Sequence, residues 1–284
     1  MPPSIEDLIR KSTNIASLPA VYMRLVEVME DPYSSADDVG AVISEDTGLT
    51  ARLLRLVNSA MYGFPSAIES VKQGLTVVGT QQIHDLALAT SVVDMFKDVP
   101  QELVDMASFW RHSIGCGVCA RALASELKAP NVERHFVAGL LHDIGKLVVF
   151  MSHPDGARAA IEQSVDDKTL LHEAENAVLG YDHAAVGQAL MSSWNLPVSL
   201  HAPVSLHHRP ARATRFQIEV AVVHLADVFA HSMLMGSSAE RWVPTLNAFA
   251  WERLGIPENA IANVLADVDQ QYEAAVRTIL EDSE

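Results

Sequence analysis

The chain has 284 residues, of which 49% are hydrophobic and 20% are charged, so it can bury a large core and is too apolar to be disordered. Its 36 acidic and 20 basic residues leave a formal charge of −16, which disfavours binding to nucleic-acid polymers and to anionic membranes. The N-terminal segment lacks a signal-peptide pattern, and there is no run of about 18 uncharged apolar residues. We therefore expect a cytoplasmic protein that does not span a membrane.

Apolar residues recur at helical spacing along nearly the whole chain, which predicts an all-α fold. The first predicted helix begins at Pro19, and the second begins at a capping box that starts at Ser35. A third helix begins at Asp46 or Thr47 and is expected to stop near Gly63.

The remaining predicted helices fall into two groups separated by residues 97–100, where the apolar period breaks. The first group lies near residues 66–75 and 78–96. The second group lies near residues 101–126, 134–151, 154–164, 168–178, 183–193, 198–208, 216–235, 246–254 and 258–281. We therefore expect an N-terminal helical half, residues 1–97, and a second half, residues 98–284, with residues 58–62 at a contact between them.

Histidine is frequent in this chain, with twelve histidines against six lysines, and it is the commonest metal ligand in proteins. The apolar segment 136–146 contains His142, Asp143 and Lys146. On a single helix, His142 and Lys146 would lie one turn apart with Asp143 between them. Gly139, on the same face, would let another element approach closely. A buried His–Asp pair needs partners, which either a divalent metal or hydrogen bonds within the core would supply.

A scattered series of histidines and aspartates resembles that of the HD superfamily of metal-dependent phosphohydrolases. The residues of this series are His112, His142, Asp143 and Asp227. The N-terminal half resembles the pattern of the HDOD branch of the superfamily, through Ser17-Leu18-Pro19, Ile43–Asp46, Leu49–Ala60 and Gly79. The resemblance covers roughly residues 5–235 and implies an HD-domain-like multi-helix bundle with an N-terminal helical subdomain.

Further histidines are similar to those of the HD-GYP relatives, which cleave cyclic dinucleotides at a bi- or trinuclear metal site. The resemblance implies seven metal ligands: His112, His142, Asp143, His183, His207, His208 and Asp227. His183 is expected to open a helix that Asp182 caps. The Gly-Tyr-Pro signature of HD-GYP enzymes is absent, and Ser108 stands where a relative with three metals carries a carboxylate. We therefore expect one or two divalent ions; iron, manganese, nickel and zinc all suit nitrogen and oxygen ligands.

The cationic side chains near these residues have two interpretations each. If the site is active, Asp143 and Lys146 are the catalytic candidates, with Lys146 stabilising charge on a phosphate or orienting a water; its alternative is a salt bridge to a carboxylate. Three arginines form the only dense basic cluster of the chain: Arg209, Arg212 and Arg215. They are expected either to bind a phosphorylated ligand or to lie on a solvated loop.

Four other side chains are expected to have structural roles. Cys116 and Cys119 lack the second cysteine pair that a zinc site of this type needs, so we expect them in the core. His224 and His231 share a helix face with Asp227 and are expected to form local hydrogen bonds.

Two functions compete at this point. The first is a regulatory, signal-transducing module whose metal serves structure or sensing; the HDOD-type half and the missing Gly-Tyr-Pro segment favour it. The second is a metal-dependent phosphodiesterase or phosphohydrolase that acts on a nucleotide or cyclic dinucleotide, which the full ligand series favours. A third is capture of a phosphorylated ligand without turnover. The expected partner is a separate signalling protein or a small phosphorylated ligand, and the sequence does not predict an oligomeric state.

Overall fold

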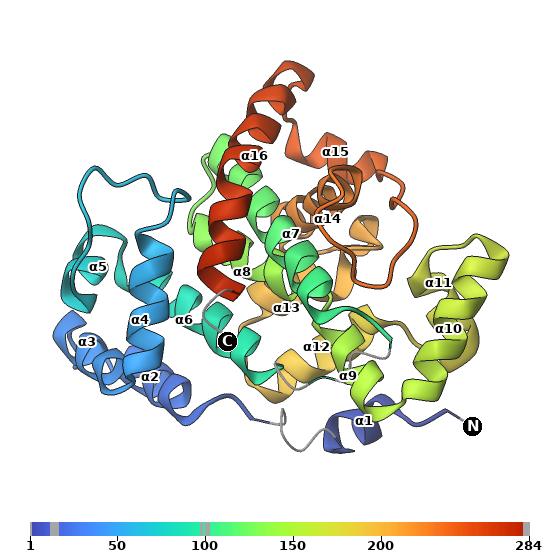
Figure 1. Ribbon diagram of the computed structural model, residues 1–284, viewed down its shortest axis with the longest axis horizontal. Coiled ribbons are helices and arrows are strands. Elements are labelled where there is room, and N and C mark those ends of the chain that lie inside the picture. Colours follow the sequence, from blue (N-terminus) through green and yellow to red (C-terminus); the bar gives the residue numbers. More distant parts are fainter. Residues whose placement is uncertain (1, 12–16, 97–98, 100–102, 281–284) are drawn as a thin grey trace.

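The computed structural model describes residues 2–11, 17–96, 99 and 103–280, and within these ranges it contains helices, turns and no β-strand (Figure 1). The helices are α1 (Ile5–Lys11), α2 (Ala20–Glu30), α3 (Ala36–Glu45), α4 (Thr47–Val57), α5 (Val71–Val77), α6 (Thr80–Met95), α7 (Met106–Glu126), α8 (Val132–Leu141), α9 (Ile144–Ser152), α10 (Pro154–Asp167), α11 (Leu171–Leu179), α12 (His183–Ser193), α13 (Val198–Leu206), the short 3₁₀ helix η1 (Pro210–Arg212), α14 (Gln217–Ser232), α15 (Ala248–Leu254) and α16 (Glu258–Leu280). The predicted all-α fold is therefore confirmed. The expected boundary at residues 97–100 lies, apart from residue 99, outside the described residues.

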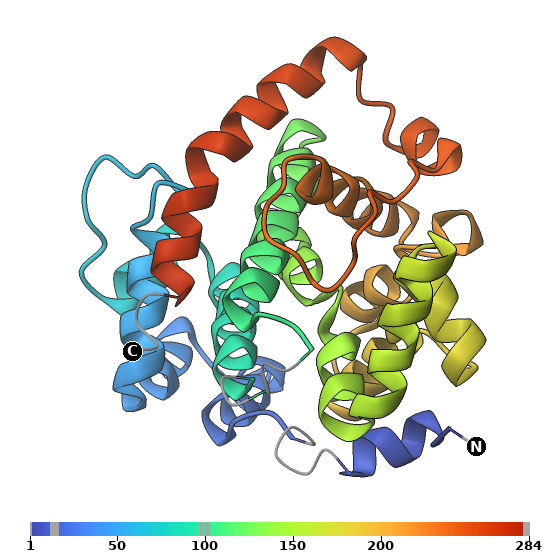
Figure 2. The ribbon, with the colours of Figure 1, turned by 45° about the vertical axis from the view of Figure 1, so that its right-hand side comes forward.

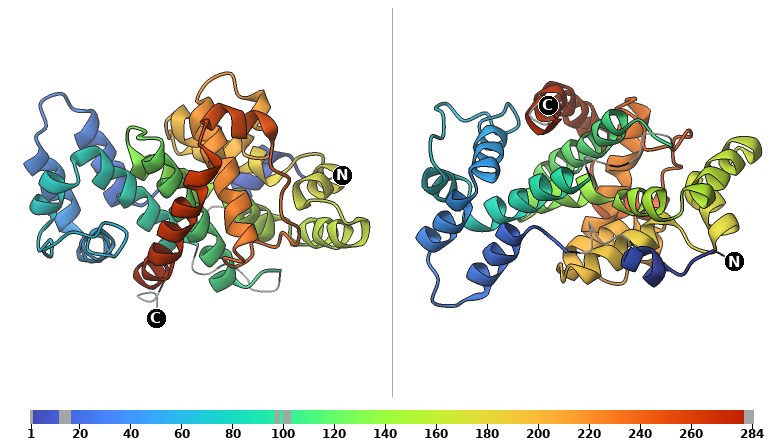
Figure 3. Two further views of the ribbon diagram at one scale, coloured as in Figure 1. Left: turned by 90° about the horizontal axis from the view of Figure 1, so that it is seen from above. Right: turned by 60° about the horizontal axis from the view of Figure 1, so that its bottom comes forward.

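Helix starts in the N-terminal half follow the predicted caps. The Ser35 and Asp38 side chains form a capping box at α3, and Oδ1 of Asp46 accepts a hydrogen bond of 2.8 Å from the Leu49 amide at α4. α1 was not predicted; it buries Leu8 and packs on α9 and α12. In Figures 1 and 3 it lies apart from α2–α5, on the side of the molecule that holds α9–α12.

The end of α4 and the start of α5 differ from the prediction. α4 ends at Val57 instead of near Gly63, and Gly63 follows a turn and has a φ of +58°. The Asn58 side chain donates to the carbonyls of Leu54 and Ile68 and accepts from the Ile68 amide at 2.7 Å. These bonds use the main-chain groups of Ile68, so the helix predicted from residue 66 instead begins at Val71.

The predicted single helix over residues 134–151 is wrong at its centre, where the chain breaks between α8 and α9. The His142 amide lies 3.5 Å from the Gly139 carbonyl oxygen, and the Lys146 amide donates to the Asp143 carbonyl at 2.9 Å. Both contacts span three residues and so tighten the backbone relative to an α-helix. His142 and Asp143 therefore occupy a junction between two helices.

Residues Val132–Ser152, which include this junction, are long and apolar enough in composition to cross a membrane. However, 89% of the apolar window is buried inside the protein. The segment is therefore accounted for as part of the core.

α7 lies at the centre of the molecule, where it packs against α8, α14 and α16 (Figure 2). One cluster of buried apolar side chains continues from the N-terminal helices through α7 to α16. Two polar contacts accompany it: the Arg121 guanidinium lies 4.8 Å from the Tyr62 ring centroid, and Arg134 on α8 pairs with buried Asp85 at 3.2 Å. The expected contact of residues 58–62 with the later helices is thus present through Tyr62.

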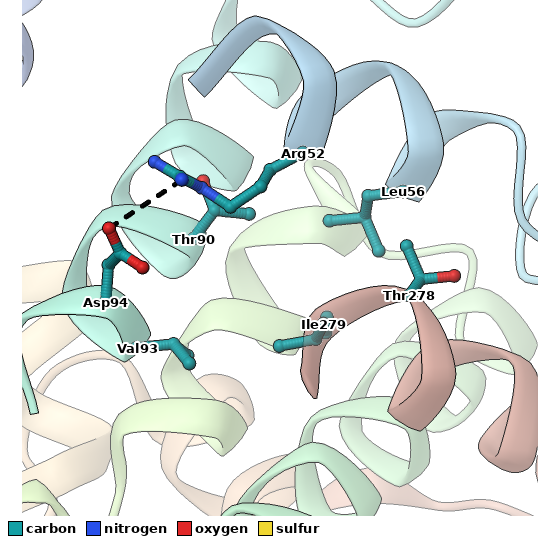
Figure 4. Close-up of a pocket in the computed structure, with 7 residues that line it drawn as sticks. All are labelled: Arg52, Leu56, Thr90, Val93, Asp94, Thr278 and Ile279. Atoms are coloured by element: carbon teal, nitrogen blue, oxygen red, sulfur yellow. Dashed lines mark ion pairs between the residues drawn. The ribbon is translucent and has the colours of Figure 1, made fainter. Parts of the chain in front are cut away.

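α16 returns to the N-terminal helices and closes a small cavity against α4 and α6 (Figure 4). The cavity is lined by Arg52, Leu56, Thr90, Val93, Asp94, Thr278 and Ile279. Its volume is about 10 Å³, which is room for about one water molecule. It contains none of the predicted site residues and is too small for a nucleotide.

Candidate metal centre

Five parts of the fold bring the seven predicted ligands together. α7 carries His112, the α8–α9 junction His142 and Asp143, α12 His183, the end of α13 His207 and His208, and α14 Asp227. Together with His231, they form four overlapping groups in which the ligand-capable atoms lie within 4.8 Å of one another. The groups are His183/His207/His208, His112/Asp227/His231, His112/His142/Asp143 and His142/His207/Asp227.

Two glycines allow the helices to approach closely enough for this. A Cβ atom added at Gly139 would lie 2.8 Å from the Cys116 carbonyl oxygen, where α8 crosses α7. One added at Gly145 would lie 2.0 Å from the carbonyl oxygen of His183, where α9 crosses α12. The predicted close approach at Gly139 is confirmed, and Gly145 sets the distance between the junction and His183.

Main-chain and carboxylate acceptors orient three of the imidazole rings. Nδ1 of His142 donates to the Gly139 carbonyl at 2.7 Å, and Nδ1 of His207 donates to the Val204 carbonyl at 2.8 Å. Nδ1 of His183 donates to Oε2 of Glu175 at 2.6 Å. A ring that donates from Nδ1 carries a lone pair on Nε2 once the ring is neutral, which is the usual arrangement of a metal-ligating histidine. Burial favours the neutral form of His207, whereas the pKa of His142 is raised, against the effect of burial, by Asp143.

Apart from the ion-pair contacts between its own imidazole and carboxylate groups, several buried atoms of the cluster have no hydrogen-bond partner among the described residues. They are both ring nitrogens of His112, Nε2 of His142, Nε2 of His207, and Oδ1 of Asp143 and Asp227. Buried polar atoms are nearly always hydrogen-bonded, so this concentration of unpartnered atoms calls for a ligand. The donor set of imidazole nitrogens and carboxylate oxygens fits a divalent transition metal.

The two carboxylates lie between the imidazole rings. Oδ2 of Asp143 is 3.3 Å from Nε2 of His142, and its Oδ1 is 3.1 Å from Nε2 of His183. Oδ1 of Asp227 is 3.3 Å from Nε2 of His112. Each carboxylate therefore links side chains of separate helices.

Burial and charge set the protonation of the cluster. Burial lowers the pKa of His112 to about 4 and holds the pKa of His207 and that of His208 well below the usual range. Burial alone would raise the pKa of Asp143, but His142 and Lys146 hold it well below its ordinary value. Burial opposes protonation of His183 as well, yet Glu175 raises its pKa to about 9. An ionised Asp143 and neutral His112, His207 and His208 are the forms that bind metal.

Lys146 is buried beside the cluster with two partners. Its Nζ donates to Oδ2 of Asp143 at 2.8 Å and to Oγ of Ser238 at 3.0 Å. The structure thus contains the salt bridge to Asp143 that was one of the two interpretations of this lysine. A role of Lys146 toward phosphate stays a prediction.

The three arginines have different environments. Arg209 pairs with Asp182 at 2.6 Å, next in the chain to His183. Arg212 is exposed, and exposed Arg215 lies with its guanidinium carbon 5.2 Å from the Phe216 ring centroid. Within the described part of the chain, no contact joins Arg212 or Arg215 to the His/Asp cluster. A shared phosphate clamp therefore stays a prediction.

Other predicted residues lie as follows. Asp182 caps α12 by accepting from the Ala185 amide at 3.0 Å, as predicted. Cys116 and Cys119 are free, fully buried thiols of the core. Nδ1 of His224 donates to the His207 carbonyl at 2.7 Å, so its bond reaches the end of α13 and is not the local bond that was expected.

Three further side chains contact the cluster that were not among the predicted site residues. Glu175 orients His183, and the His172 ring is stacked on His208 with 4.0 Å between ring centroids. His231 lies one turn after Asp227, with Nδ1 2.9 Å from Oδ1 of that carboxylate. The spacing of Asp227 and His231 was a visible signal for this contact, whereas nothing local points from Glu175 or His172 to the cluster.

Comparison with known proteins identifies related sequences. The family model for the HDOD domain matches residues 15–210. An uncharacterised protein of Treponema pallidum is 24% identical over 196 residues, which is 69% of this chain. The chain spans only 38% of the length of that relative.

Solved structures show the same fold. An HDOD domain protein of unknown function from Geobacter sulfurreducens has a TM-score of 0.78 and 23% identity, with 93% of each chain covered. A candidate phosphohydrolase from Shewanella amazonensis has a TM-score of 0.76 and 26% identity, covering 96% of this chain and 98% of its own. A candidate signal transduction protein from Marinobacter aquaeolei has a TM-score of 0.71 and 19% identity, covering 92% of this chain and 59% of its own.

Proposed function

Because the chain belongs to the HDOD domain family, we propose that it is a signal-transduction module that keeps a divalent-metal site. The proposed ligands are His112, His142, Asp143, His183, His207, His208 and Asp227. The proposed partner is a separate signalling protein or a small phosphorylated ligand.

The observation that carries the metal site is the convergence of buried atoms without hydrogen-bond partners. Imidazole nitrogens and carboxylate oxygens from separate helices face one another within 4.8 Å, and main-chain carbonyls hold His142 and His207 with Nε2 free. A bound divalent ion would join these helices and could polarise a phosphoryl oxygen as a Lewis acid. Glu175 holds His183, and Lys146 balances the charge of Asp143.

Burial supports regulation over turnover. Apart from half-buried His208, each of the seven proposed ligands is at most 3% exposed, and Ser238, which bonds Lys146, is fully buried. A catalytic metal site keeps an open position that substrate can reach, whereas a structural or sensing site is closed by protein. This arrangement fits a metal that fixes the positions of helices.

A metal-dependent phosphohydrolase acting on a nucleotide or cyclic dinucleotide is the second candidate. The ligand series is complete, and the similar candidate phosphohydrolase from Shewanella amazonensis covers nearly the whole chain at 26% identity. In that case Asp143 and Lys146 would hold charge and protons next to the reacting phosphate. Some opening of the segment around Ser238 would be needed first, because that segment covers Lys146.

Metal analysis tests the proposal. Protein purified without added metal, or reconstituted with Mn²⁺ or Zn²⁺, is expected to hold at least about one equivalent of ion. Asp143→Ala should abolish this uptake and leave the N-terminal half folded, whereas exposed Arg212→Ala serves as the control and should keep the ion. A wild-type protein without metal after reconstitution would refute the site. Metal-dependent turnover of cyclic dinucleotides or simple phosphodiesters would replace the regulatory function by the second candidate.

A further inference from the structure

His231 lies on α14 beside the proposed site. Its side chain is 8% exposed, and Nδ1 lies 3.0 Å from the Asp227 carbonyl oxygen, to which only a protonated nitrogen can donate. Nε2 is buried and has no hydrogen-bond partner among the described residues. The ring is thus held from one side and has a free nitrogen on the other.

The same arrangement occurs at two of the proposed ligands. His142 and His207 also donate from Nδ1 to a main-chain carbonyl of the preceding turn and keep an unpartnered, buried Nε2. His231 matches them in the bond to a main-chain carbonyl, and its Nδ1 also lies 2.9 Å from Oδ1 of Asp227.

The position of His231 places it at one end of the cluster. Its ring centroid is 4.3 Å from that of His112, and both nitrogens of His112 are unpartnered. Ligand-capable atoms of His112, Asp227 and His231 lie within 4.8 Å of one another. At the other end, the group His183, His207 and His208 offers three imidazoles.

We propose that His231 is a further metal ligand, at the end of the cluster formed by His112 and Asp227. This inference rests on the proposed metal site and extends its ligand set by one imidazole. The site then has two ends with three side chains each, which provides ligands for two ions. The competing role is positioning only, in which His231 donates to the Asp227 carboxylate and never contacts the ion.

A matched control is available on α8. His135 is 5% exposed, and its Nδ1 lies 3.4 Å from the Asn131 carbonyl oxygen. Its Nε2 is buried and has no hydrogen-bond partner in the described part of the chain. It belongs to none of the four ligand groups. His231→Phe and His135→Phe therefore remove similar rings from inside and outside the site.

The experiment uses Co²⁺ alone as the probe, with bound ion measured by metal analysis and coordinated imidazoles counted as hyperfine-shifted N–H proton signals in NMR spectra. His231→Phe is expected to lose one such signal. It should also bind one ion fewer or lose more than about 100-fold in Co²⁺ affinity, whereas removing a residue that only hydrogen-bonds a metal ligand typically costs ~10–100-fold. His135→Phe should match wild type. His231→Asp replaces the imidazole by a carboxylate ligand and serves as a second test if His231→Phe does not fold. It should bind Co²⁺ again but still lack that imidazole signal.

The outcomes separate this inference from the proposed function. An unchanged signal count in a His231 variant that binds Co²⁺ would overturn the role of His231 and leave the other seven ligands in place. A wild-type protein that takes up no Co²⁺ would overturn both.

Discussion

Nε2 of His183 lies 3.1 Å from Oδ1 of Asp143, although the two residues belong to different helical elements. The other oxygen of Asp143 accepts a hydrogen bond from Lys146 at 2.8 Å and lies 3.3 Å from Nε2 of His142. The Asp143 carboxylate therefore contacts the first residue of α12, its neighbour in the α8–α9 junction and the buried ammonium group of Lys146.

Replacing Lys146 by methionine should destabilise the metal-free protein. The variant leaves the buried Asp143 carboxylate without its ammonium partner, and breaking a buried ion pair in this way costs about 3–5 kcal/mol. Urea unfolding in the presence of a chelator measures the loss, and added metal should reduce it because the ion restores positive charge. Lys72→Met is the control: its pair with Asp37 is exposed, so the loss should be below about 1 kcal/mol. Equal losses in the two variants would contradict the importance of the buried pair.

Gly145→Ala should both lower stability and disturb the proposed metal centre. The new Cβ would lie 2.0 Å from the His183 carbonyl oxygen, so α9 and α12 must separate, at a cost of about 1–3 kcal/mol or more. Gly74→Ala is the comparison, since its Cβ would meet only side-chain atoms at 3.6 Å, and alanine favours a helix by about 1 kcal/mol. Thermal unfolding and Mn²⁺ titration check both variants; wild-type Mn²⁺ affinity in Gly145→Ala would show that the helix crossing does not position His183.

The metal-free protein should lose stability as the pH falls from 6.5 towards 4. Burial lowers the pKa of His172 in the folded protein to about 4 from its ordinary value of 6.5. In this pH range the unfolded chain binds a proton that the folded chain does not, so acidification favours unfolding. His172→Phe, which keeps a ring against His208, should show a smaller slope of unfolding free energy against pH. His112, whose pKa is also lowered to about 4 by burial, should keep part of the slope. An unchanged slope in the His172 variant would contradict the prediction, and above pH 7 the two proteins should respond alike.

Helix ends that depend on neighbouring residues could be predicted from the sequence. The caps at Ser35, Asp46 and Asp182 each use a side chain and an amide three residues apart. The end of α4 could not be predicted in this way, because Asn58 bonds to Ile68, ten residues away. The break at His142 was equally hidden, since the segment has helical periodicity throughout and only the packing of α8 and α9 on other helices separates the two.

The predicted ligands lie together, but their chemistry depends on contacts that no local pattern contains. Glu175 was missed because its bond to His183 links two helices through a turn. His231 was expected to bond locally, which it does through Nδ1, while the unpartnered state of its Nε2 became visible only with the surrounding helices in place. The residue types thus indicated which side chains belong to the proposed metal site. Only the tertiary structure shows which of their nitrogen and oxygen atoms have no other hydrogen-bond partner.

The central position of α7 affects where the chain can be divided. The HDOD match ends at residue 210, before α14 and α16, which pack on α7. A fragment that stopped there would lack Asp227 and would leave α7 without two of the helices that pack on it. The residues that the family model matches therefore form a shorter piece than the fold needs to keep all the proposed ligands and the helices that pack on α7. Genetic dissection of this protein should keep the helices through α16.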